Sequence, residues 1–77
     1  MPKLRRATAE ETIRALERLG FTQTRQRGSH VVLKKQLANG ERICVVPLHG
    51  KQLAIGTLRA ILRQADVTPD EFMANIT

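Results

Sequence analysis

Two histidines, His30 and His49, are the residues of this chain best suited to proton transfer. Histidine changes its charge close to neutral pH and can serve as general base or general acid there. Nearby lysine and arginine side chains could stabilise the negative charge that develops on a phosphate during a reaction. Cleavage of RNA needs both functions, because a base removes the 2′-hydroxyl proton and an acid protonates the departing 5′-oxygen. The candidate cations beside the histidines are Arg25, Arg27, Lys34 and Lys51.

The two histidines and the neighbouring Gly28 and Ser29 also have purely structural interpretations. A histidine at the start of a strand, such as His30, is commonly a polar surface residue, and His49 sits beside a glycine in an expected loop. Gly28 is most simply a turn glycine. Ser29 could provide a turn hydroxyl, a phosphate contact or a nucleophile, although no positioned acid supports the last role. Residue types and spacing alone therefore predict a basic α/β domain that binds RNA, and they leave catalysis open.

The charge distribution favours a polyanionic partner. Lysine and arginine total 13 against 7 acidic residues, which gives a formal net charge of +6 and a pI near 10.8. No acidic residue occurs from Arg18 to Gly40 or from Arg42 to Ala65. The resulting positive field suits nucleic acid, whereas the alternative interpretation is an ordinary solvated surface.

Length and composition limit the class of protein. A chain of 77 residues, with 42% hydrophobic and 26% charged residues, predicts one folded domain over residues 1–77. Cys44 has no partner for an internal disulfide and lies in an apolar run, where we expect a buried thiol. No apolar stretch is long enough for a signal peptide or a membrane span, so we expect a cytoplasmic protein. The few histidines and distant acids predict no metal or other cofactor.

Local signals predict the helix boundaries. Thr8 and Glu11 form a capping box at the start of a first helix, which Gly20 ends. Phe21 is expected to anchor the core. A second helix carries an apolar stripe, and a short third helix starts at a second capping box with proline at its first position. The stripe consists of Leu58, Ile61, Leu62 and Ala65, and the second box of Thr68, Pro69, Asp70 and Glu71.

Three strands are expected between these helices, over residues 22–26, 30–35 and 41–48. Gly28 and Ser29 separate the first two, and Asn39-Gly40 is a typical two-residue hairpin turn between the others. The predicted fold class is α+β: a helix, three antiparallel strands, a second helix and a short C-terminal helix. Packing both main helices on one sheet face would bury the apolar stripes and leave the other face open.

A turn centred on Asn39 and Gly40 also predicts a register. It places Ala38 opposite Glu41, Lys35 opposite Cys44, Leu33 opposite Val46, and His30 opposite His49. Because side chains alternate along a strand, both histidines would then lie side by side on the open face. The predicted apolar face holds Val31, Leu33, Leu37, Cys44, Val46 and Leu48. The open face holds His30, Val32, Lys34, Val45, Pro47 and His49.

Several blocks of the chain, in this order and spacing, resemble the HicA (YcfA-like) toxin family of toxin–antitoxin systems. The resemblance covers about residues 8–76, and only the blocks together make it specific. The matching blocks are Leu19-Gly20-Phe21, Arg25-Gln26-Arg27-Gly28-Ser29-His30, Val46-Pro47-Leu48-His49, Gly56-Thr57-Leu58-Arg59 continuing to Ala65, and Glu71-Phe72.

The resemblance implies a fold like that of double-stranded-RNA-binding domains. It also implies an mRNA interferase, which cuts transcripts and so arrests translation and growth, and a partner antitoxin, HicB, whose acidic surface covers the active site. The family's functional histidine corresponds to His30, whereas the role of the residue corresponding to His49 stays open between catalytic and structural. Arg25, Arg27, Lys34 and Lys51 are then expected to contact phosphate. The backbone N–H groups of Gly56 and Thr57 are candidates for another phosphate, unless they simply start a helix.

Two other functions remain open from the sequence. The chain could be an RNA-binding module that does not cut, although its second helix begins without the lysine cluster typical of double-stranded-RNA binders. It could also be an interaction subunit whose basic surface binds an acidic protein.

Overall fold

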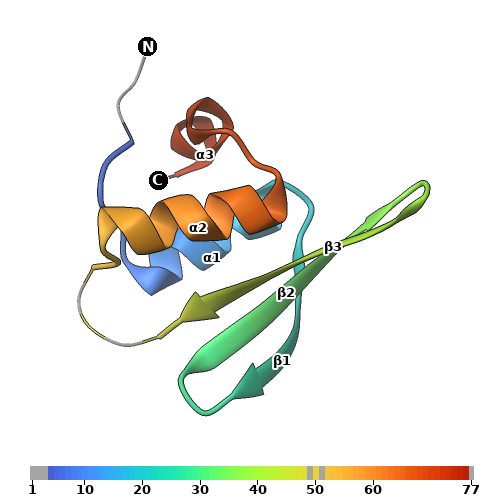
Figure 1. Ribbon diagram of the computed structural model, residues 1–77, viewed down its shortest axis with the longest axis horizontal. Coiled ribbons are helices and arrows are strands. Elements are labelled where there is room, and N and C mark those ends of the chain that lie inside the picture. Colours follow the sequence, from blue (N-terminus) through green and yellow to red (C-terminus); the bar gives the residue numbers. More distant parts are fainter. Residues whose placement is uncertain (1–3, 49, 51, 77) are drawn as a thin grey trace.

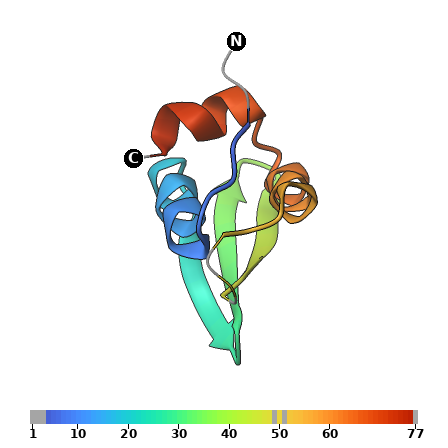
Figure 2. The same cartoon turned by 90° about the vertical axis from the view of Figure 1, so that its left-hand side faces the viewer.

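The elements in chain order are α1 (Ala9–Arg18), β1 (Thr22–Arg27), β2 (His30–Leu37), β3 (Gly40–Pro47), α2 (Ile55–Ala65) and α3 (Pro69–Asn75). The sheet has the strand order β1-β2-β3, with both strand pairs antiparallel, and it carries α1 and α2 on one face (Figures 1 and 2). This is a computed structural model that describes residues 4–48, 50 and 52–76. The short α3 lies across the end of the two main helices (Figure 2). The predicted α+β order of elements is therefore confirmed.

Both predicted capping boxes form. At α1 the Thr8 hydroxyl accepts a hydrogen bond from the Glu11 backbone N–H at 3.0 Å, and the Thr8 N–H donates to the Glu11 carboxylate at 2.9 Å. Thr68 and Glu71 make the same pair of bonds at α3. Gly20, with φ of +103°, follows the end of α1 in a left-handed conformation, as predicted. These local bonds set the positions of two helix starts and one helix end.

The core lies between the sheet and the two main helices. From the sheet it receives alternate residues of β2 and β3, and Phe21 joins it at 3% exposure. Among the described residues, Thr12 is the one polar residue that is buried, and its hydroxyl donates to the Thr8 carbonyl oxygen at 2.9 Å. The predicted stripe of α2 is buried in full. The sheet residues of the core are Val31, Leu33, Cys44 and Val46.

The predicted register of β2 and β3 is wrong by two residues. Leu33 pairs with Cys44 rather than Val46, and His30 pairs with Pro47 rather than with His49. The turn is centred on Ala38 and Asn39, because Leu37 pairs with Gly40. Gly40 follows the turn directly as the first residue of β3, and its φ of +152° is a conformation that glycine adopts readily. Accordingly, Gln36 faces Glu41, and Arg42 lies opposite Lys35.

A shift of two residues leaves every side chain on its predicted face, because side chains alternate with a period of two. Val31, Leu33, Cys44 and Val46 face the helices as expected. Leu37 and Leu48, at the ends of the apolar face, are each 37% exposed, so they contribute little to the core.

No helix within the described residues is long and apolar enough to cross a membrane.

The capping boxes predict a pH dependence of stability. Hydrogen bonds from the backbone N–H groups of Thr8 and Thr68 hold the pKa values of Glu11 and Glu71 below the ordinary value of 4.5. A carboxylate whose pKa is lower in the folded state stabilises the fold above its unfolded pKa, and this stabilisation is lost as the pH falls through the folded value. The melting temperature of the wild type should therefore drop below about pH 4.5.

In the double variant Glu11→Gln/Glu71→Gln the two boxes keep a hydrogen-bonding side chain but lose the titrating groups. Its melting temperature, followed by circular dichroism, should change less between neutral pH and about pH 3 than that of the wild type. Identical pH profiles would show that the boxes contribute nothing to acid unfolding.

Candidate nucleic-acid interface

The turn between β1 and β2 presents His30 at the end of the sheet. Arg27 pairs with His30, so Gly28 and Ser29 are the two central residues of the hairpin. Gly28 has φ of +55°, whereas Ser29 does not have a positive φ. A positive φ at the first central residue alone is the pattern of a type II′ turn, which favours glycine there. Gly28 is thus the predicted turn glycine.

Two hydrogen bonds hold this turn to its surroundings. The Gln26 side-chain amide donates to the Gly28 carbonyl oxygen at 3.3 Å, and the Leu48 backbone N–H donates to the Ser29 carbonyl oxygen. The second bond extends the β2–β3 pairing by one step and places the end of β3 beside Ser29. Sequence reasoning missed both contacts. For the bond from Gln26 to Gly28, the sequence offers one local sign, which is a polar side chain two positions before the turn glycine.

The open sheet face carries three of the four predicted phosphate-binding residues. Arg27, His30 and Pro47 lie across from one another in the three strands, and Arg25 lies across from Val32 in the same way. Since Val31 and Leu33 face the helices, the residues at positions 30, 32 and 34 face away from them. Lys34 therefore joins His30 on this face. His49 and Lys51 lie outside the described residues, so their roles stay predictions.

A β-bulge in β1 places the side chains of Arg25 and Arg27 on this face. The register with β2 shifts between Gln23 and Arg25, which leaves Thr24 as the extra residue of a bulge. The Thr24 hydroxyl donates to the Val32 carbonyl oxygen at 3.3 Å. Upstream of the bulge Thr22 pairs with Lys34, and downstream Arg25 pairs with Val32. The polar sequence of β1 has no alternation from which this bulge could have been predicted.

Distances along the face separate two groups of cations. Directly paired residues of antiparallel strands have Cβ atoms about 4.5–5.5 Å apart, so Arg27 is the cation nearest to His30 among the residues that the structure describes. Lys34 lies four residues further along β2, which corresponds to about 13 Å at 3.3 Å per residue. One phosphate beside His30 can thus be reached by Arg27, and Lys34 is placed for a different phosphate.

A shallow hollow of about 320 Å³ lies on this face beside the bulge. Lys34 forms a 3.8 Å ion pair with Glu41 at its rim, and both side chains are about two-fifths exposed. Such a surface pair contributes at most about 1 kcal/mol, so Lys34 can exchange Glu41 for a phosphate. Arg25 and Arg27 form no ion pair within the described residues. The hollow is lined by Thr24, Arg25, Val32, Lys34 and Ile43.

Two further sequence predictions concern the Cys44 thiol and the start of α2. Cys44 is 1% exposed, as predicted, and burial raises its pKa to about 11, so it is protonated at neutral pH and is not a nucleophile. Gly56 and Thr57 lie in the first turn of α2, whose N-cap residue Ala54 makes no side-chain hydrogen bond. Their contact with phosphate stays a prediction.

A comparison with protein families gives a match over most of the chain. The family model described as the HicA toxin of bacterial toxin–antitoxin systems matches residues 9–67. The chain belongs to the HicA toxin family. In this HicA-family chain the match begins with α1, includes the β1–β2 turn with His30, and ends directly after α2. Family membership makes the chain the toxin half of a toxin–antitoxin system. A search of curated proteins finds no match.

The conformation of Gly28 gives a prediction about the turn. Apart from its two chain neighbours, no described residue has a heavy atom within 4 Å of the position that a Cβ would occupy, so the φ of +55° is what opposes substitution. Gly28→Ala should destabilise the fold by about 1–2 kcal/mol. The matched control is Gly56→Ala in α2, which is equally uncrowded but has no positive φ. It should leave stability unchanged or raise it by up to about 1 kcal/mol. Urea unfolding measures both, and equal effects of the two variants would contradict the assigned turn.

Proposed function

We propose that this HicA-family toxin belongs to a type II system and is a metal-independent endoribonuclease that cleaves mRNA, which inhibits translation and growth. The observation that carries the proposal is the direct pairing of His30 with Arg27 across the β1–β2 turn, on the sheet face opposite α1 and α2. This pairing supports the proposal because it brings a proton-transfer group and a cation within reach of the same phosphate. The family match supports the same reaction class.

The roles follow from the chemistry of RNA cleavage. The 2′-oxygen attacks phosphorus while a base takes its proton, and the 5′-oxygen leaves with a proton from an acid. His30 performs one of these transfers, and Arg27 stabilises the charge on the same phosphate. His49 and Ser29 are the candidates for the complementary transfer or for a supporting contact, and the role of His49 stays open between catalytic and structural. Arg25, Lys34 and Lys51 hold neighbouring phosphates.

The proposed regulator is a HicB-type antitoxin with an acidic surface that covers the open sheet face. The excess of cations on this face supports electrostatic attraction of such a partner. Because mRNA is the proposed substrate, the proposed site of action is the cytoplasm.

The direct test compares the wild type with His30→Ala on a labelled RNA in the presence of EDTA. The wild type should cleave, and the variant should lose cleavage by about 10²-fold or more, the usual contribution of a general acid or base. RNA affinity, measured by fluorescence anisotropy, should change little. Equal RNA binding with no cleavage by either protein would instead indicate a non-catalytic RNA-binding module.

A second substrate tests the nucleophile. An RNA with a single 2′-deoxy nucleotide at the cleavage site lacks the attacking hydroxyl, so the wild type should bind it and leave it intact. Cleavage at the substituted position would contradict attack by the 2′-hydroxyl.

The phosphate contacts predict a salt dependence. Arg25→Ala should weaken RNA binding for all sequences alike and reduce the slope of log K against log salt by about 0.7, the value for one contact to a single strand. Arg14→Ala is the control, because Arg14 lies on α1 and is paired with Glu10 at 2.6 Å. If both variants change the slope equally, the effect reflects net charge rather than the sheet face.

A further inference from the structure

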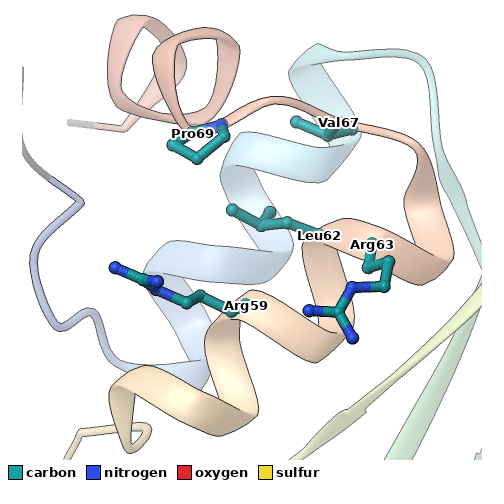
Figure 3. A pocket seen from close by; sticks show the side chains of 5 residues that line it. All are labelled: Arg59, Leu62, Arg63, Val67 and Pro69. Carbon is teal, nitrogen blue, oxygen red and sulfur yellow. The ribbon is translucent and has the colours of Figure 1, made fainter. Parts of the chain in front are cut away.

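A notch opens on the helix layer, between α2 and the segment that joins it to α3 (Figure 3). Its volume is about 340 Å³. Leu62, Val67 and Pro69 supply aliphatic lining, and the side chains of Arg59 and Arg63 extend from α2 beside them. The notch thus combines an apolar floor with two cations, and the proposed reaction uses none of these residues.

The two arginines are available to an external anion. They lie one helical turn apart on α2, so their side chains are neighbours. Within residues 4–48, 50 and 52–76, neither takes part in an ion pair. Asp66, the C-cap residue of α2, is already paired with Arg42 at 3.4 Å. Both guanidinium groups can therefore donate hydrogen bonds to an external carboxylate.

The notch lies away from the candidate nucleic-acid interface. Gln64 marks the side of α2 that faces the sheet edge, because its side-chain oxygen accepts a hydrogen bond from the Val45 backbone N–H at 3.4 Å. With 3.6 residues per turn, Arg59 points about 140° and Arg63 about 100° away from Gln64 around the helix. RNA bound on the open sheet face would leave the notch accessible.

The lining favours a protein ligand over RNA. Proteins that hold single-stranded nucleotides commonly stack bases on aromatic side chains. The aromatic residues of this chain are Phe21 and Phe72, which are 3% and 0% exposed, so neither can stack a base at the notch. Aliphatic side chains prefer an apolar partner, and guanidinium groups bind carboxylates in a two-pronged geometry. The matching ligand is a peptide segment with an aliphatic side chain next to aspartate or glutamate.

We propose that the notch is a second docking point for the antitoxin, separate from the sheet face. An acidic segment of that partner places an aliphatic side chain against Val67 and Pro69 and its carboxylates on Arg59 and Arg63. The inference rests on the proposed function only in taking the acidic antitoxin as the partner. It implies that antitoxin affinity depends on the notch, whereas RNA cleavage does not.

The experiment uses the full chain with Arg59→Ala/Arg63→Ala and the purified antitoxin of the same toxin–antitoxin pair. Both arginines are exposed, so the fold should be retained, which circular dichroism checks. Titration calorimetry should show affinity for the antitoxin reduced by roughly tenfold to a hundredfold, the usual effect of losing hydrogen bonds to a charged group. RNA cleavage by the free variant should equal that of the wild type.

The matched control is Arg14→Ala/Arg18→Ala, which removes an arginine pair of the same spacing from α1. These arginines are already engaged, Arg14 with Glu10 at 2.6 Å and Arg18 with the Asn75 carbonyl oxygen at 2.7 Å. The control should keep wild-type antitoxin affinity.

Three results would overturn the docking point. They are unchanged antitoxin affinity in the notch variant, an equal loss in the control, and loss of RNA cleavage in the notch variant, which would assign the notch to RNA. Absence of cleavage by the wild type would refute the proposed function but leave the comparison of affinities valid.

Discussion

The alternation of buried and exposed side chains along β2 is the constraint on which the rest of this structure depends. β2 is the central strand, so the alignment of β1 and of β3 is set through it. Val31 and Leu33, at 2% and 0% exposure, hold one face of the strand against the helices. His30 and Lys34 are thereby held on the opposite face. A slip by one residue would bury the histidine and expose the core residues, which makes such a slip costly.

Local chemistry and this alternation together explain which sequence predictions succeeded. The capping boxes at Thr8 and Thr68 depend on residues three apart, so local chemistry determines them. The faces of β2 follow from burial and survived a wrong register, because the error was two residues. The turn itself was misplaced since Asn39-Gly40 and Ala38-Asn39 both offer a glycine close to the bend. Where that glycine takes its positive φ is decided by the pairing of two whole strands.

The candidate site was less accessible to sequence reasoning. Its residue types and the turn at Gly28 could be predicted from local pattern, but catalysis by His30 was suggested by the family resemblance. The bulge at Thr24 and the bond from Leu48 to Ser29 come from pairing between segments distant in sequence. No periodicity in the polar strand β1 could have indicated them. The structure therefore adds the alignment of Arg25 and Arg27 with the histidine face.

The basic residues of the chain divide between two surfaces with different surroundings. On the sheet face they accompany a histidine and a shallow hollow, an arrangement suited to a phosphate backbone. On the helix layer Arg59 and Arg63 accompany aliphatic side chains, an arrangement suited to an acidic protein segment. Under the two proposals, RNA binds on the sheet face, and part of the antitoxin's binding site lies outside that face.

Mass spectrometry of the RNA fragments made by the wild type and by His30→Ala tests the central claim most directly. If His30 transfers a proton during attack by the 2′-hydroxyl, the wild type yields fragments with 2′,3′-cyclic phosphate and 5′-hydroxyl ends, and the variant yields none. Fragments with 5′-phosphate ends from the wild type, or the same cyclic ends from the variant at an undiminished rate, would contradict the account.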